Sequence, residues 1–339
     1  MSKAAEPVHR RLHVNVRMIG RLIACSYLSV AFLAATSIHA QHLTLEGQTG
    51  GFITPTAYVV YTDKGQFFSH PAFGYHFINS SQVIGSIQTV NFAEGFANRG
   101  ELGYTRSIHT LGDSTNVANG AFSELWKYDG MNIFSGKIVA VKDGEFGPWT
   151  PGLAAGFVAR TRDFFVTSHL NSALGLGPGA ANHNEDVYAV ATKEWLHPPV
   201  PFLLNFGLKF TNATIFGIGG QSTRFGGRLF GGLGIPLPGP FKTAIVPAVG
   251  FTQEPHTAQN LAYIIPGGVH IPTTLDYAVR ITQAERPHFS IDLGVGQVAG
   301  NIGTAVLPTG LPAPYPPVVS IPVNLQARKV FGMGLSYRY

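Results

Sequence analysis

The chain has 339 residues, of which 12% are charged and 12% aromatic, and it contains 41 glycines and 23 prolines. The charged fraction is roughly half of that in an ordinary soluble domain, and the glycines and prolines predict many short strands and turns. Residues 1–40 hold five of the 23 Lys and Arg and one of the 18 Asp and Glu, which leaves 18 basic and 17 acidic residues after them. The basic balance of the whole chain is therefore no argument for nucleic-acid binding.

The first 40 residues have the pattern of a secretory signal peptide. Five basic residues precede an apolar run over 22–35, and Ile38-His39-Ala40 offers a cleavage point before Gln41. We expect residues 1–40 to be removed on export, which leaves a mature chain 41–339 without its one cysteine, Cys25, and so without a disulfide. Two alternatives fit less well. The lipoprotein-like sequence ending at Cys25 lies before the apolar run, and Arg10-Arg11 lacks the rest of a twin-arginine signal.

From residue 41 onward the sequence predicts strands throughout. No stretch approaches the roughly 20 unbroken apolar residues of a membrane helix, so a chain of this kind would cross a membrane as a closed sheet. Pro55 cannot donate a ladder hydrogen bond, so 51–61 is a doubtful extra strand that could be a strand end, an edge or an inward fold. The predicted strands are 66–77, 82–92, 101–107, 132–142, 153–160, 187–195, 203–211, 224–235, 243–252, 276–282, 289–298 and 326–339.

The last predicted strand has one apolar and one polar face. Large apolar side chains occupy every second position from Phe331 to Tyr339, and glycines, Ser336 and Arg338 lie between them. Strands 203–211 and 289–298 alternate in the same way. A chain that ends on an aromatic residue, with another two residues before it, resembles bacterial outer-membrane β-barrels. In those barrels the last strand marks the protein for assembly, which implies that Tyr337 and Tyr339 form a signal to the barrel-assembly machinery.

Long and short connections alternate between the predicted strands. The connections 109–131, 161–186, 253–275 and 299–325 are long, whereas 143–152, 196–202, 236–242 and 283–288 are short. This alternation is typical of outer-membrane barrels, with short periplasmic turns and long outer loops, although the tiny connection 79–81 breaks it. We therefore predict an all-β fold: a single antiparallel transmembrane β-barrel of about twelve strands, within a range of roughly ten to fourteen.

The predicted lumen carries several charged residues. Two interpretations are open: a basic lumen that selects anionic or sugar-like solutes, or an inward network of salt bridges that fills the barrel. The lumen-facing candidates are Lys137, Arg160, Lys209, Arg224, Arg228, Arg280, Asp292 and Arg338.

Other motifs give no catalytic, cofactor or metal site. The glycine-rich runs 217–220 and 231–234 do not precede a helix, so a phosphate-binding loop is not predicted. His183, Glu185 and Asp186 fall in a connection of ordinary solvated composition, and no zinc-type spacing occurs. The proline-rich run 307–317 predicts a stiff outer loop.

Two short motifs resemble known families. Residues 50–57 and 291–297 are similar to two related groups of bacterial outer-membrane β-barrels, one of which is exopolysaccharide-associated and has a Gly-x-Ile-x-x-Pro-Thr-Ala start. Residues 45–50 fit better an uncharacterised outer-membrane domain family that begins Leu-x-Gly-x-Thr-Gly. The resemblance implies a barrel in the bacterial outer membrane and brings no catalytic residues.

The function expected from these features is a passive or export-associated channel for small polar, anionic or saccharide solutes. The alternative is a plugged structural or adhesin-like barrel whose outer loops bind a partner, and a lipid-modifying enzyme is a third reading. We expect contact with outer-membrane lipid and none with nucleic acid, and the sequence gives no oligomeric state.

Overall fold

The computed structural model describes residues 42–80, 85–110, 129–163, 183–196, 201–213, 217, 221–255, 273–283, 288–298, 301–308, 318–324 and 329–339. The predicted signal peptide 1–40 lies outside the described residues. The described residues include no helix long and apolar enough to cross a membrane.

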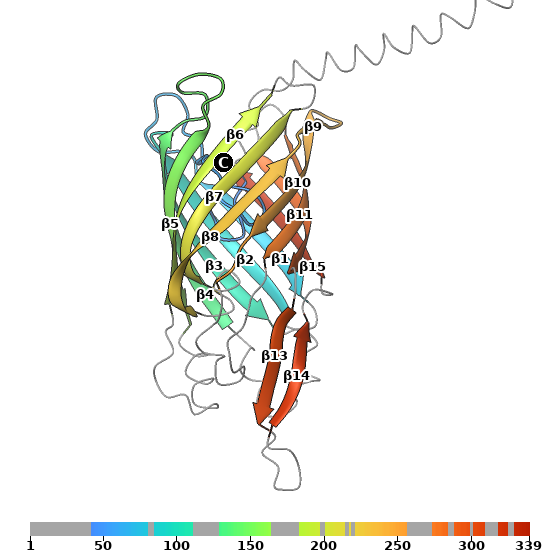
Figure 1. The fold of residues 1–339 in the computed structure, drawn as a ribbon. Coiled ribbons are helices and arrows are strands. Elements are labelled where there is room, and N and C mark those ends of the chain that lie inside the picture. Colours follow the sequence, from blue (N-terminus) through green and yellow to red (C-terminus); the bar gives the residue numbers. More distant parts are fainter. Residues whose placement is uncertain are drawn as a thin grey trace, which may run out of the picture.

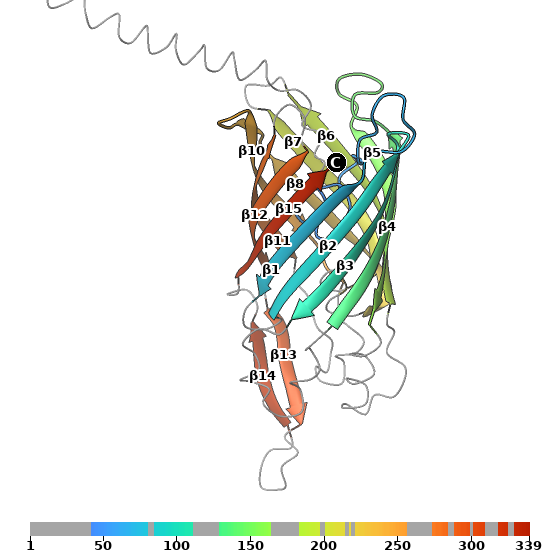
Figure 2. The same cartoon turned by 180° about the vertical axis from the view of Figure 1, so that it is seen from behind.

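Twelve antiparallel strands close into a barrel (Figure 1 and Figure 2). The first strand pairs with the last, from Ala72 opposite Arg338 to Asn79 opposite Phe331, so the wall has no free edge. The barrel strands are β1 (Ala72–Ser80), β2 (Gly85–Phe96), β3 (Gly100–Thr110), β4 (Asp129–Val141), β5 (Gly152–Arg162), β6 (His183–Trp195), β7 (Phe202–Ala213), β8 (Gln221–Gly234), β10 (Thr243–Thr252), β11 (Thr274–Gln283), β12 (Phe289–Val298) and β15 (Lys329–Arg338). The prediction of an antiparallel barrel of about twelve strands is confirmed.

The structure differs from the predicted elements in four places. The first strand begins at Ala72 instead of residue 66, and the doubtful strand 51–61 is not a strand but lies inside the barrel. The predicted long loop 299–325 contains a hairpin, β13 (Asn301–Pro308) and β14 (Val318–Asn324), that pairs only with itself. The short strand β9 (Leu237–Pro238) pairs with the start of β10.

The two ends of the barrel differ. The C-terminus, β9 and the turn at residues 142–151 lie at one end, and the β13–β14 hairpin extends from the other (Figure 1). Arg106 of β3 lies opposite Asn132 of β4, near the hairpin end of the wall. It donates two hydrogen bonds to Asp163, just beyond β5, and these hold the pKa of the Asp163 carboxyl below its usual range.

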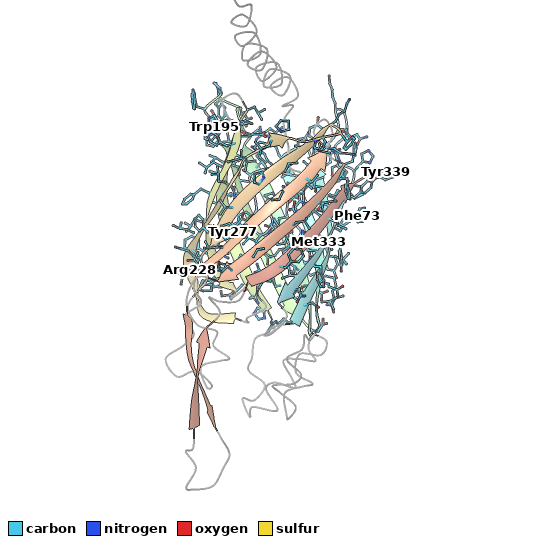
Figure 3. The ribbon with its side chains drawn as sticks, turned by 90° about the vertical axis from the view of Figure 1, so that its right-hand side faces the viewer. Phe73, Trp195, Arg228, Tyr277, Met333 and Tyr339 are labelled. Atoms are coloured by element: carbon cyan, nitrogen blue, oxygen red, sulfur yellow. The ribbon has the colours of Figure 1, made fainter. Side chains whose placement is uncertain are left out.

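Side chains alternate between the outer and inner faces of the wall. On β7, four apolar side chains that are 40–53% exposed alternate with buried Asn205, Lys209 and Thr211 and a glycine. Phe73 and Tyr277 likewise lie on the outer surface (Figure 3). An outer surface this apolar exceeds the isolated patches that soluble monomers show, and it matches the lipid-facing band of a membrane barrel.

Candidate functional site

Residues 42–62 lie inside the barrel, and we call this segment the plug. Residues 42–50 are all buried. The segment folds on itself through its own main chain: Thr44 N donates to Gln48 O at 2.7 Å, and Gly50 N donates to His42 O at 3.0 Å. It contributes no strand to the wall. The segment therefore fills part of the lumen without belonging to the cylinder around it.

A glycine is required where the plug approaches β3. Gly47 has a φ of +82°, and a Cβ atom there would lie 2.2 Å from Thr105 Oγ1 on the wall. An L side chain would meet both an unfavourable backbone conformation and a steric clash. Gly47 thus lets the plug turn pack directly on the wall.

The first anchor of the plug is a buried carboxylate on β3. Glu101 accepts hydrogen bonds from Thr49 N and Val60 N, both at 2.9 Å, and from the Thr49 hydroxyl. Lys137 on β4 lies 3.2 Å from the same carboxylate and donates to Thr49 O at 3.0 Å. Since Thr49 and Val60 lie in different parts of the plug, one ion pair on the wall holds both.

The second anchor is Arg160 on β5, which is 1% exposed. Its Nε donates to Glu46 of the plug at 2.6 Å, and Nη2 donates to Asp186 of β6 at 2.6 Å. Nη1 contacts Asn184 at 3.3 Å. A guanidinium suits this position because its fixed fork of donors can reach the plug and the wall at once.

The third anchor joins His42 to β12. His42 Nε2 lies 2.8 Å from Asp292 Oδ2, and His42 Nδ1 lies 2.9 Å from Ser290 Oγ. Arg280 donates to both oxygens of Asp292 at 2.9 Å each, and also to Gly50 O of the plug at 3.1 Å. Asp292 is therefore satisfied by one wall cation and one plug histidine.

Ser290, His42 and Asp292 meet in the order of a nucleophilic triad, but their position does not suit a lipid-modifying enzyme. Ser290 is 5% exposed and faces the plug inside the barrel, away from the lipid-facing surface. A triad needs open space beside its nucleophile for the substrate. We interpret this cluster as a structural anchor of the plug.

Further contacts hold residues 55–58 of the plug, which lead toward β1. Ala57 N donates to Thr192 Oγ1 at 2.8 Å, and Asn205 Nδ2 donates to Pro55 O at 2.9 Å. The Tyr58 hydroxyl donates to Asp143 at 2.9 Å. Because Pro55 has no N–H, its carbonyl is the group left for the wall to bind.

The eight predicted lumen residues differ in what they contact. Lys137, Arg160, Arg280 and Asp292 contact the plug directly, as described above. Arg338 is 7% exposed and lies 3.3 Å from Asp63, just beyond the plug, while Lys209 lies 3.9 Å from Glu254. Arg228 is partly buried near the hairpin end (Figure 3) and donates to Glu254 O at 2.8 Å. The side chain of Arg224 lies outside the described residues.

The sequence-based prediction included Asp292 but missed the acidic partners Glu101 and Glu46, and it left an inward fold as one of three alternatives for residues 51–61. Glu101 was visible as an inward acid, since it shares the polar face of β3 with Thr105 and Ser107. Glu46 and His42 carried no such signal, because the plug has no regular period and its wall partners are distant in sequence. The geometry therefore favours the salt-bridge network over the basic lumen.

Residues 183, 185 and 186 do not converge on a common point. His183 and Glu185 are 60% and 38% exposed and lie 3.9 Å apart, whereas Asp186 points inward to Arg160. Across the described parts of the chain, no group of three or more His, Cys, Asp or Glu is placed to hold a metal ion.

No protein-family model and no curated protein matches this chain. Among solved structures, the KdgM porin is 9% identical, covers 79% of this chain and 99% of its own, and gives a TM-score of 0.39. The translocator domain of the autotransporter NalP from Neisseria meningitidis is 12% identical, with coverage of 82% and 91% and a TM-score of 0.35. OmpF of Salmonella typhi is 8% identical, with coverage of 81% and 97% and a TM-score of 0.29.

Sequence identities and TM-scores this low do not support any conclusion about function. The barrel assignment rests on the strand pairing itself, and the resemblance to the two named families stays a prediction.

Proposed function

We propose that the chain is an outer-membrane β-barrel acting as a passive or export-associated conduit for small polar solutes, and that the described conformation is its closed state. The outer surface supports the membrane location: large apolar side chains face outward, while charged groups such as Arg160 and Asp292 are buried inside. This is the reverse of a soluble protein and the arrangement that lipid requires.

The proposal of a conduit rests on one observation: the wall of the barrel is complete without the plug. The twelve strands pair in a complete ring, and none of those pairings involves residues 42–62. The plug is held by non-covalent contacts alone: hydrogen bonds and ion pairs to polar wall groups that water can solvate, and apolar packing of residues such as Leu45 and Phe52. It can therefore leave the lumen without breaking the barrel, and a polar passage would remain.

The charges inside the wall favour uncharged polar solutes such as saccharides. Six cations and seven carboxylates of the described wall and its rims are buried or nearly so, the seventh being Asp143 beside Lys193, so the lumen without the plug is close to neutral. The cations are Lys137, Arg160, Lys193, Lys209, Arg280 and Arg338, and the carboxylates are Glu101, Asp143, Asp186, Glu194, Glu254, Asp276 and Asp292. A neutral lumen lined by hydrogen-bonding groups selects by size and polarity more than by charge.

Planar-bilayer recording tests this function. The wild-type barrel should remain mostly closed, and a variant lacking residues 42–62 should conduct steadily with little preference between cations and anions. Liposome swelling should then show entry of small saccharides only through the deletion variant. A deletion variant that folds but never conducts would contradict the proposal.

That outcome would support the second candidate, a plugged structural or adhesin-like barrel. The favouring observation is the buried polar contact between plug and wall, with an ion pair between Glu46 and Arg160 and a short contact between His42 and Asp292. Removing one partner of a buried pair is strongly destabilising, so a permanent plug would stiffen the barrel.

Assembly through the last strand belongs to the same proposal. Tyr337 and Tyr339 are 49% and 72% exposed on the outer surface of the barrel, where an assembly factor can reach them. Replacing both with serine should reduce insertion into the outer membrane while refolding in detergent is preserved.

A further inference from the structure

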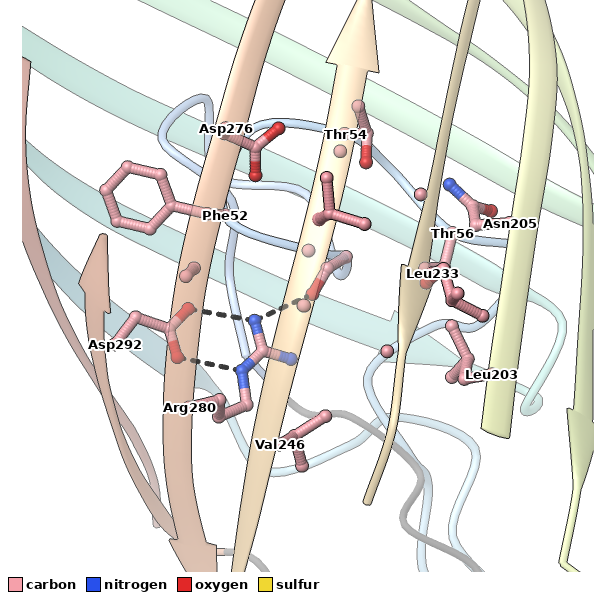
Figure 4. Close-up of a pocket in the computed structure, with 18 of the residues that line it drawn as sticks. Phe52, Thr54, Thr56, Leu203, Asn205, Leu233, Val246, Asp276, Arg280 and Asp292 are labelled. Carbon is pink, nitrogen blue, oxygen red and sulfur yellow. Dashed lines mark hydrogen bonds and ion pairs between the residues drawn. The ribbon is translucent and has the colours of Figure 1, made fainter. Parts of the chain in front are cut away.

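A cavity of about 90 Å³ lies between the plug and the wall (Figure 4). The bend of the plug at residues 50–56 forms one side. The other side is hollow because small residues face inward there: Gly232 of β8 lies opposite Gly250 of β10, which lies opposite Asp276 of β11. Ala248 continues the same hollow. Larger side chains at these positions would fill the space.

Asp276 lines this cavity without a partner of its own. The side chain is 6% exposed, and Oδ1 has no hydrogen-bond partner among the described residues. A Cβ atom at Gly250 would lie 2.3 Å from Oδ1, so the carboxylate occupies room that the glycine leaves. A buried carboxylate without a partner is costly, and a bound donor would offset that cost.

The charges around the cavity are mostly negative. Four charged residues line it: Glu194, Asp276, Asp292 and Arg280. The one cation is already used, because Arg280 binds both oxygens of Asp292 and the carbonyl of Gly50. The cavity therefore favours a positively charged occupant.

The rest of the lining is largely apolar. Phe52, Leu203, Leu233 and Val246 surround the space, with the hydroxyl of Thr54 near the plug bend (Figure 4). We propose that this cavity binds a small organic cation, an ammonium group carrying a short apolar chain. The ammonium donates to Asp276, and the chain packs against Leu203 and Val246.

Other ligand classes fit less well. A hard metal ion takes six to eight oxygens or a nearly ideal octahedron of them, whereas the lining offers one carboxylate without a partner. An anion would meet Asp276 and Asp292 with Arg280 already paired. A neutral molecule of the same shape would leave Asp276 without a charged partner. The proposal does not depend on conduction, since the cavity exists while the plug is in place.

Isothermal titration of the full barrel in detergent with n-propylammonium chloride tests the inference. n-Propanol and sodium propionate serve as neutral and anionic probes of similar shape. Asp276→Asn removes the charge and keeps the shape, so we expect it to weaken n-propylammonium binding by about tenfold or more. Glu145→Gln, a carboxylate in the turn after β4, is the matched control and should leave binding unchanged.

A second variant covers the case in which Asp276→Asn fails to fold. Ala248→Leu keeps the carboxylate and fills the cavity, and it should also abolish binding. Equal affinity for n-propylammonium and n-propanol would overturn the proposal, as would no n-propylammonium binding to the wild-type barrel. Undiminished binding to a folded Asp276→Asn or Ala248→Leu variant would overturn it as well. Loss of binding in either variant, with the control intact, would support it.

Discussion

Glu101→Gln is the perturbation that separates the plug from its wall most directly. The carboxylate accepts hydrogen bonds from Thr49 N and Val60 N at 2.9 Å each, and lies 3.2 Å from Lys137 Nζ. Glutamine has the same shape, but one oxygen becomes an amide that donates. At least one plug N–H then faces another donor, and Lys137 loses its counter-ion.

The substitution Glu101→Gln destabilises the closed state more than the open state. With the plug seated, Lys137 is 2% exposed and is left with neutral acceptors, among them the carbonyl of Thr49, in place of a counter-ion. Removing one partner of a buried ion pair costs about 3–5 kcal/mol. With the plug released, water solvates the same amine and most of that cost disappears. The equilibrium should therefore shift toward release by roughly a hundredfold to several thousandfold.

Single-channel recording in planar bilayers measures that shift as open probability. Glu101→Gln should open far more often than the wild type, with the conductance of the variant lacking residues 42–62. Glu145→Gln removes a carboxylate that contacts Arg99 and not the plug, so it should behave as the wild type. If a folded Glu101→Gln barrel stays as closed as the wild type, the reasoning about this anchor is refuted.

Two further predictions follow from the plug and from the outer surface. Gly47→Ala places a Cβ atom against Thr105 at a position with positive φ, so it should destabilise the seated plug by about 1–3 kcal/mol. Amide exchange in residues 42–50 should therefore be faster in this variant. Unchanged exchange would contradict the steric argument. Leu293→Arg puts a charge on the lipid face in the middle of β12 and should cost about 2–4 kcal/mol in lipid vesicles by urea unfolding. Phe241→Arg, in a turn where the side chain is 96% exposed, should cost little, and equal costs at the two sites would argue against a lipid-facing β12.

The barrel was readable from the sequence because its signal is local. Alternation along β7 and β12 sets which side chains face outward, and the alternation of β5 and β7 predicted that Arg160 and Lys209 face inward. The β13–β14 hairpin was missed because the proline-rich run 307–317 favoured a loop, whereas the flanking residues pair with each other.

The structure of the plug could not be predicted from the sequence because it depends on contacts with residues that are distant in the chain. Glu46 meets Arg160 across 114 positions, and Leu43 N meets Ser336 Oγ across 293. Nothing in the local pattern of residues 42–62 records these contacts. Pro55 showed only that the segment was a poor strand, and an inward fold was one of three readings that this left open.

Amide hydrogen exchange of residues 42–62, in the full-length barrel in lipid nanodiscs, tests the central claim most directly. The amides of Leu43, Thr49, Ala57 and Val60 are buried and donate to wall side chains. A seated plug predicts that they exchange far more slowly than those of an unfolded peptide, and faster in Glu101→Gln than in the wild type. Exchange of the whole segment at the unfolded rate in the wild-type barrel would contradict the account.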